Sequence, residues 1–277
     1  MKKVFLALGL AACLLGGNQL FAQFTAEEQA DYAKWEDFLA TAKLVGRPEH
    51  LTGSQAVTEP WVLTLEKDGV RSRALWKNVL GEKIGGYKET WKGEIAAYRL
   101  NRLLGVNMVP PTVEREFQGD RGSCQLWVEA PYTMETIRAK KLNPPSLKTA
   151  AFYRALYMQR AFDNLISNED RHQRNYIITD DWRMILIDHS RTFRTTKKFT
   201  TRLIYDEKFK EGPNFIMDSV PKAFYEALKA LTPEAIGEAV GEYLTDQEIA
   251  ATIARRDLMI AWLDKRIAAL GETRVLY

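Results

Sequence analysis

The hydrophobic pattern in the first half of the chain is mainly that of β-strands. Two apolar runs typical of strands, Trp61–Leu65 and Val70–Val79, flank the sequence EKDG, whose glycine permits a tight turn and so predicts a hairpin. A further strand is predicted in SCQLWVE, residues 123–129. Between them, KGEIAAYRLNRLL carries apolar residues at helical spacing and ends before Gly105, which predicts one helix.

The second half changes to a mainly helical pattern after the proline-rich sequence KLNPPS. Helices are predicted over residues 146–168, 232–244 and 245–270, and a capping box of Thr245 and Glu248 opens the last one. A short hairpin, NYII and MILID around TDDWR, interrupts them. The expected fold class is α+β, with a helical extension over 23–47, a β-rich unit over 48–142 and a helical unit over 143–277.

The N-terminus, MKKVFLALGLAACLLGGNQLFAQ, combines two lysines, an apolar run from Val4 to Gly17 and a small residue, Ala22. This layout is typical of a secretory signal peptide and predicts removal of residues 1–22. The run is shorter than the about 20 apolar residues of a transmembrane helix, which disfavours an uncleaved anchor. LAAC, ending at Cys13, resembles a lipoprotein signal, but the segments before it are short for one. We therefore expect an exported protein, periplasmic or extracellular, without a stable membrane span.

Composition and charge exclude some kinds of partner and crosslink. Removal of Lys2 and Lys3 with the leader would lower the formal net charge from +3 to +1, whereas a nucleic-acid-binding protein usually has a clustered basic face. We therefore expect no nucleic-acid partner. Of the two cysteines, only Cys124 would remain, so no intrachain disulfide is expected. The chain is 46% hydrophobic, which is enough to build a core.

Short polar residues interrupt the apolar runs in DNLISNEDRHQRNYIITDDWRMILIDHS, residues 163–190. Asp170 follows the predicted long helix, Asn175 starts the hairpin five residues later, and Asp188 ends the hairpin. Protein kinases place a catalytic base and two Mg²⁺ ligands in this order, and such oxygen ligands suit Mg²⁺. An ordinary hairpin with polar turns is one alternative. A transition-metal hydrolase site is another, although no H-E-x-x-H motif is present.

NEDRHQRNYI, followed by LIDHSRTF, resembles the atypical branch of the protein-kinase-like fold, whose catalytic loops read D-R-H-x-x-N. This branch includes phosphatidylinositol 3- and 4-kinases, HipA-type kinases, CotH-type spore-coat kinases and the secretory-pathway kinases. The resemblance implies a two-lobed α+β fold, with a small β-rich N-lobe that carries one key helix and a larger, mainly helical C-lobe. It also implies that Asp170 is the catalytic base and that Asn175 and Asp188 bind metal. Through GEIAAYRLNRLLGVNMVPPT, it implies that Lys77 and Glu94 form the ion pair that holds the α- and β-phosphates of ATP.

Other parts of the resemblance are less complete. Arg171 and His172 are implied to brace the catalytic loop. No G-x-G-x-x-G is present, and LTGSQAV, which contains Ser54, is either a reduced phosphate-covering loop or a surface turn. The segment from Trp127 to Glu129 is implied to connect the lobes and to bind adenine through its backbone. His189 and Ser190 stand where ordinary kinases have phenylalanine and glycine after the metal-binding aspartate.

The resemblance therefore implies an exported kinase that uses ATP with Mg²⁺, or with Mn²⁺, to phosphorylate a hydroxyl group. Its implied partners are the nucleotide and an unknown protein or small-molecule acceptor. A pseudokinase that binds nucleotide or a partner protein is the alternative, and an enzyme that transfers a nucleotidyl group is a third. Retention of all the expected site residues favours the enzyme, whereas the scarcity of ATP outside the cytoplasm favours the pseudokinase.

Overall fold

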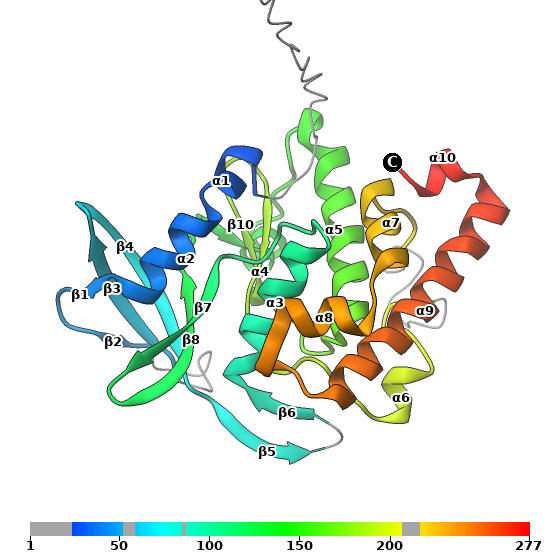
Figure 1. Ribbon diagram of the computed structural model, residues 1–277. Helices are drawn as coiled ribbons and strands as arrows, with labels where there is room; N and C mark the ends of the chain where they lie inside the picture. The colour runs from blue at the N-terminus through cyan, green and yellow to red at the C-terminus, as the bar shows by residue number, and fades with distance from the viewer. Residues whose placement is uncertain (1–23, 52–58, 85–86, 207–216) are drawn as a thin grey trace, which may run out of the picture.

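The computed structural model describes residues 24–51, 59–84, 87–206 and 217–277 (Figure 1). The predicted leader with Cys13, and Ser54 of LTGSQAV, lie outside the described residues. Figure 1 shows a curled antiparallel sheet on one side and a larger group of helices on the other, which is the predicted two-lobed α+β arrangement.

The first lobe is built on a six-stranded sheet in which the strands pair in the order β1-β3-β4-β8-β7, with β2 also paired to β3. The predicted hairpin is present: β3 (Trp61–Lys67) and β4 (Val70–Lys77) pair along their length. Asp68 and Gly69 form its turn with φ values of 51° and 76°, as a two-residue type I′ turn requires. The other strands are β1 (Lys43–Leu44), β2 (Glu49–His50), β7 (Thr112–Phe117) and β8 (Asp120–Leu126).

The predicted helix of the first half is α3 (Trp91–Leu103), which joins the sheet to the second lobe. The Thr90 hydroxyl accepts a hydrogen bond from the Lys92 N–H at 3.2 Å and so caps the helix. Gly105, with a φ of 64°, follows its end as predicted. Ala96, Ala97, Tyr98 and Leu100 of α3 belong to the large core of the second lobe, whereas the sheet has a smaller core of its own. The hairpin of β5 (Leu80–Ile84) and β6 (Tyr87–Thr90), which the pattern did not indicate, precedes α3.

Helices dominate the second lobe, and its two long ones, α5 (Ser146–Ile166) and α9 (Asp246–Leu270), pack against each other. The predicted capping box of Thr245 and Glu248 opens α9. None of the described helices is long and apolar enough to cross a membrane. The remaining elements are α4 (Met134–Ala139), η1 (Gln173–Asn175), β10 (Tyr176–Ile178), β11 (Met184–Leu186), α6 (Lys197–Thr200), α7 (Lys222–Ala230), α8 (Pro233–Val240), η3 (Gly241–Tyr243) and α10 (Glu272–Val275). Of these, α6 and α7 lie where the sequence pattern showed only a loop.

The link between the lobes lies at residues 127–131. Directly after it, β9 (Tyr132–Thr133) pairs with β10, and α4 packs on β10 and η1. Both elements precede the predicted boundary at residue 143, yet their contacts are with the second lobe. This packing favours a lobe boundary at 127–131 rather than at KLNPPS.

Two N-terminal helices, α1 (Ala26–Ala30) and α2 (Tyr32–Thr41), occupy the segment predicted as one amphipathic helix and contact both lobes. Glu28 Oε2 forms an ion pair of 2.5 Å with Arg183, in the turn between β10 and β11. Arg115 of β7 donates hydrogen bonds of 2.6 Å to two carbonyls at the end of α2. The N-terminal helices and the interlobe link border one cavity of about 530 Å³.

Candidate active site

Lys77, Glu94 and Asp188 meet where the sheet, α3 and the β10–β11 hairpin come together. Lys77 is the last residue of β4, Glu94 lies in the first turn of α3, and Asp188 follows β11 by two residues. The Lys77 Nζ is 2.6 Å from Glu94 Oε1 and 2.9 Å from Asp188 Oδ1. The structure thus brings together three residues that the sequence singled out separately.

The charges of this group favour a bound cation. Burial would lower the pKa of Lys77, but the carboxylates of Asp188 and Glu94 outweigh that effect and hold this pKa above its usual value. Burial would also raise the pKa values of both carboxyl groups, yet the Lys77 ammonium keeps each below its usual value. All three groups are therefore charged at neutral pH. One ammonium faces two carboxylates, which leaves an excess of negative charge beside Asp188.

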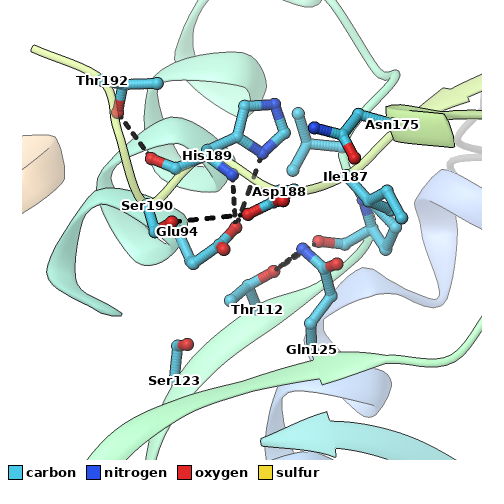
Figure 2. Close-up of polar contacts among 12 residues, drawn as sticks. Glu94, Thr112, Ser123, Gln125, Asn175, Ile187, Asp188, His189, Ser190 and Thr192 are labelled. Atoms are coloured by element: carbon cyan, nitrogen blue, oxygen red, sulfur yellow. Dashed lines mark hydrogen bonds and ion pairs between the residues drawn. The ribbon is translucent and has the colours of Figure 1, made fainter. Parts of the chain in front are cut away.

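His189 connects this ionic group to the catalytic loop. Asp188 has a left-handed backbone, with a φ of 62°, and the N–H of His189 after it donates to Glu94 Oε2 at 2.9 Å (Figure 2). The His189 Nε2 lies 2.9 Å from an Arg171 nitrogen. Because arginine can only donate, Nε2 accepts and the ring is neutral. Burial agrees with this state, because it lowers the pKa of His189.

Gly93 allows α3 to approach the segment after Asp188 closely. A Cβ atom at Gly93 would lie 2.7 Å from the His189 carbonyl oxygen and 3.2 Å from the Thr192 hydroxyl oxygen. That hydroxyl already donates to the same carbonyl at 2.7 Å (Figure 2). The space that a methyl group would need is therefore occupied by backbone, which cannot move as a flexible side chain can.

We therefore expect Gly93→Ala to destabilise the protein by about 1–3 kcal/mol, because an extra methyl group in a packed region strains its neighbours. Gly237→Ala is the matched control, since Gly237 lies within helix α8 and a Cβ there would meet no atom within 4 Å. Alanine is the better helix former, so this variant should be stabilised by up to about 1 kcal/mol. Urea unfolding of both variants measures the difference. Equal effects of the two substitutions would contradict the close approach at Gly93.

Arg171 fixes the loop that carries Asp170. Its buried guanidinium makes two hydrogen bonds with Asp163 of α5, 2.9 Å from Nε to Oδ2 and 3.0 Å from the second nitrogen to Oδ1. It also donates to the carbonyls of Asn175 at 3.0 Å and Ile187 at 2.6 Å. A forked, fully paired arginine holds its partners in one geometry. It ties the loop to α5 and to the end of the hairpin.

A second buried arginine, Arg255 of α9, joins the end of α5 to the segment that follows Asp188. Its Nε donates to the Leu165 carbonyl at 2.6 Å, and another nitrogen donates to the Arg194 carbonyl at 2.7 Å. Burial lowers the pKa of Arg255 to about 9. Three carbonyl or hydroxyl acceptors, the third being Thr252 at 3.0 Å, satisfy this side chain. The long C-terminal helix is therefore attached to the end of α5 and to the segment after Asp188, which lie on either side of the Asp170 loop in the sequence.

The Asp170 carboxylate is 38% exposed and is paired with Arg191. An Arg191 nitrogen lies 3.2 Å from Asp170 Oδ2, while the Arg191 Nε lies 3.1 Å from Oε1 of Glu89, in β6. The Asp170 carbonyl accepts hydrogen bonds from the His172 N–H at 2.8 Å and the Asn175 amide at 3.4 Å. Asp170 therefore presents an accessible carboxylate on a loop held by these bonds, with Arg191 paired to one of its two oxygens.

The donor atoms at this site suit a Mg²⁺ or Mn²⁺ ion. Asp188 is partly exposed and Asn175 is buried beside it, so one carboxylate and one amide oxygen are available (Figure 2). Among the described residues, no group of three His, Cys, Asp or Glu side chains could hold a metal by itself. Mg²⁺ usually takes one or two protein carboxylates and completes its shell with water and phosphate oxygens. The residues present fit such an ion.

The other predicted residues lie further from this group. His172 is exposed and takes part in the loop through its backbone. In the interlobe link, the Arg73 guanidinium lies 4.4 Å from the centre of the Trp127 ring and forms an ion pair of 2.5 Å with Glu129. Binding of adenine by this backbone stays a prediction. Ser54 is outside the described residues.

Sequence reasoning missed the contacts of Asp163, His189 and Arg191. Asp163 follows Gln159 by four residues, on the predicted buried face of α5, and a carboxylate in such a place signals a buried cationic partner. That signal was available in the sequence. No local pattern indicates the hydrogen bond between His189 and Arg171, or the position of Arg191 between Asp170 and Glu89, because each joins distant segments.

Comparisons with known proteins agree with this architecture. No family model matches the sequence, and neither does any curated protein. Among solved structures, the Golgi casein kinase with Mn and ADP bound gives a TM-score of 0.60 at 16% identity, and the match covers 90% of this chain and 79% of that one. Hydra Fam20, solved with sugar, gives 0.62 at 16% identity and covers 92% of this chain and 95% of that one. At this identity the similarity concerns the fold, and the chain has the two-lobed α+β fold of the protein-kinase-like proteins.

Proposed function

We propose that this protein is an ATP-dependent kinase that phosphorylates a hydroxyl group of a protein or small-molecule acceptor. The observation that carries the proposal is the contact of Lys77 with both Glu94 and Asp188. Kinases hold the phosphates of ATP with such a lysine, and an aspartate in the position of Asp188 binds the metal. The kinase-like neighbours in fold, one of them with Mn and ADP bound, support the proposal.

Each residue has a role that its environment supports. Lys77 donates to the α- and β-phosphates, and Glu94 holds its ammonium in place. Asp188 and Asn175 hold Mg²⁺ or Mn²⁺, which when bound bridges phosphate oxygens and neutralises their charge. Asp170 accepts the proton of the acceptor hydroxyl, which requires a carboxylate within hydrogen-bond reach. Arg171 positions the loop and does not need to contact substrate.

The pair between Arg191 and Asp170 also fits the second candidate, a pseudokinase that binds nucleotide without transfer. Arg191 already pairs with Glu89 as well, so in a kinase it would keep that partner when the acceptor displaces it from Asp170. In a pseudokinase the pair would persist. The proposal also includes export to the periplasm or the extracellular space, which the pattern of lysines and apolar residues at the N-terminus supports.

Mass spectrometry of the purified protein and candidate acceptors, after incubation with ATP and Mg²⁺ or Mn²⁺, tests the proposal. We expect a mass increase of one phosphoryl group that depends on metal, and a thermal shift with metal and ATP. Ligand at 100 times its dissociation constant stabilises a fold by about 2.7 kcal/mol, so the shift is measurable. A shift without transfer would identify the pseudokinase. A mass increase of one nucleotidyl group, or the absence of any shift, would contradict the kinase.

A further inference from the structure

A cavity of about 830 Å³ lies in the second lobe beside the catalytic loop. Its wall comes from α4, α5, the loop from Glu169 to Tyr176 and the segment after α6. Glu169 and Arg171, the two neighbours of Asp170, both belong to this wall. The volume falls within the roughly 300–1,000 Å³ typical of small-molecule sites. None of the roles proposed for Lys77, Glu94 and Asp188 uses this cavity.

Cations outnumber anions around the cavity. Arg138 of α4 and Arg202 are exposed, and neither forms an ion pair within the part of the chain that the structure describes. Among the described residues of the wall, Glu169 is the one that carries a carboxylate. Lys198 already pairs with it at 2.5 Å. The remaining charge is positive, so the cavity favours an anion.

Tyrosines line the same cavity, and one ring face each of Tyr157 and Tyr176 lies against an arginine, Arg160 and Arg171 respectively. Tyr157, Tyr176 and Tyr205 all belong to its wall. The Arg160 guanidinium lies 5.4 Å from the centre of the Tyr157 ring, and the Tyr205 hydroxyl lies 3.5 Å from the Gln159 amide. Aromatic faces pack against the C–H faces of a sugar or polyol, while hydroxyls and guanidinium groups bind its oxygens. Peptides are more often held in extended grooves or along sheet edges.

From these features we infer that the cavity binds the acceptor, and that the acceptor is a small polyhydroxyl anion, such as a sugar acid or a sugar phosphate. This inference rests on the proposed kinase function and names its acceptor class. In this inference the anionic group lies near Arg138 and Arg202, and the acceptor hydroxyl leaves the cavity past Glu169 and Arg171, the two neighbours of Asp170 that belong to its wall. Because Arg171 fixes the loop, a ligand held here keeps a defined position relative to the Asp170 carboxylate.

Calorimetric titration of the full chain with glucose 6-phosphate and with glucuronate, in the absence of nucleotide, tests the inference. Glucose is the neutral control. We expect at least one of the anions to bind, and glucose to bind at least about tenfold more weakly, because it lacks the charge-assisted hydrogen bonds. Arg138→Gln/Arg202→Gln should weaken anion binding by about tenfold or more. Lys140→Gln/Lys197→Gln, at exposed lysines outside the cavity, should leave it unchanged.

Three results would overturn the inference: no binding of either anion, equal binding of glucose, or an unchanged anion affinity in Arg138→Gln/Arg202→Gln. Stronger binding of oligoglutamate than of both sugar anions would overturn the ligand class in favour of an acidic peptide. Both arginines are exposed, so the double variant should melt at the wild-type temperature. The titration contains no nucleotide, and it can therefore fail while ATP binding at Lys77 is intact, or succeed while ATP binding fails.

Discussion

Asp170→Asn is expected to lower the rate of phosphoryl transfer by about 10²–10⁴-fold and to leave the thermal shift with Mg-ATP unchanged. The amide has the shape of the carboxylate but cannot take a proton from the acceptor hydroxyl. Asp170 is 38% exposed and forms its ion pair with the partly exposed Arg191, so the substitution leaves no buried charge without a partner. Folding should therefore change little, because exposed pairs contribute about 0–1 kcal/mol.

Asp188→Asn is the matched control, since it makes the same chemical change at the other carboxylate. It should remove the metal-dependent part of the thermal shift, because the negative charge that favours the cation is lost. The two roles are interchanged if Asp170→Asn loses the shift and Asp188→Asn keeps it. Unchanged transfer in Asp170→Asn would exclude that residue as the base.

Lys77→Met should destabilise the fold by about 3–5 kcal/mol and also abolish transfer. An exposed lysine could be replaced at little cost to folding. In the structure Lys77 is only 8% exposed, and its loss leaves the carboxylates of Glu94 and Asp188 facing each other without a cation. Urea unfolding and an ATP-dependent transfer assay measure the two effects separately.

The double variant Lys77→Met/Glu94→Gln separates structure from catalysis. Removal of the buried carboxylate should restore part of the lost stability, whereas transfer should stay abolished because no ammonium holds the phosphates. Lys67→Met is a control for an exposed ion pair, with Asp37, and should cost about 0–1 kcal/mol. Recovery of transfer in the double variant would show that Lys77 acts only through folding.

The elements and residues that the sequence predicted are those encoded within short segments. The turn at Asp68 and Gly69 and the helix before Gly105 follow from local backbone preferences, so both are confirmed. Asp170, Asn175 and Asp188 also lie within one short stretch of sequence, where the Asn175 amide donates to the Asp170 carbonyl and Asp188 pairs with Lys77, while their roles stay predictions.

Contacts that close large loops could not be predicted locally. The Glu94 carboxylate accepts from the His189 N–H across 95 residues, and Arg191 reaches Glu89 across 102. The local sequence around these residues does not indicate which distant residue each one contacts, because such pairs depend on how the lobes pack. The short strand β9 was missed for a related reason, since two residues show no periodicity and its pairing with β10 defines it.

The N-terminal helices form a second connection between the lobes, parallel to the covalent link at residues 127–131. Arg115 attaches the end of α2 to the sheet, and Glu28 attaches α1 to Arg183 of the other lobe. A rotation of one lobe against the other must either carry both attachments along or break the ion pair of Glu28. If the protein binds nucleotide as proposed, the rates at which nucleotide enters and leaves would therefore depend on this N-terminal segment, which lies outside the proposed phosphate and metal site. Proteolysis or partner binding at α1 would change those exchange rates while leaving the chemistry of the site intact.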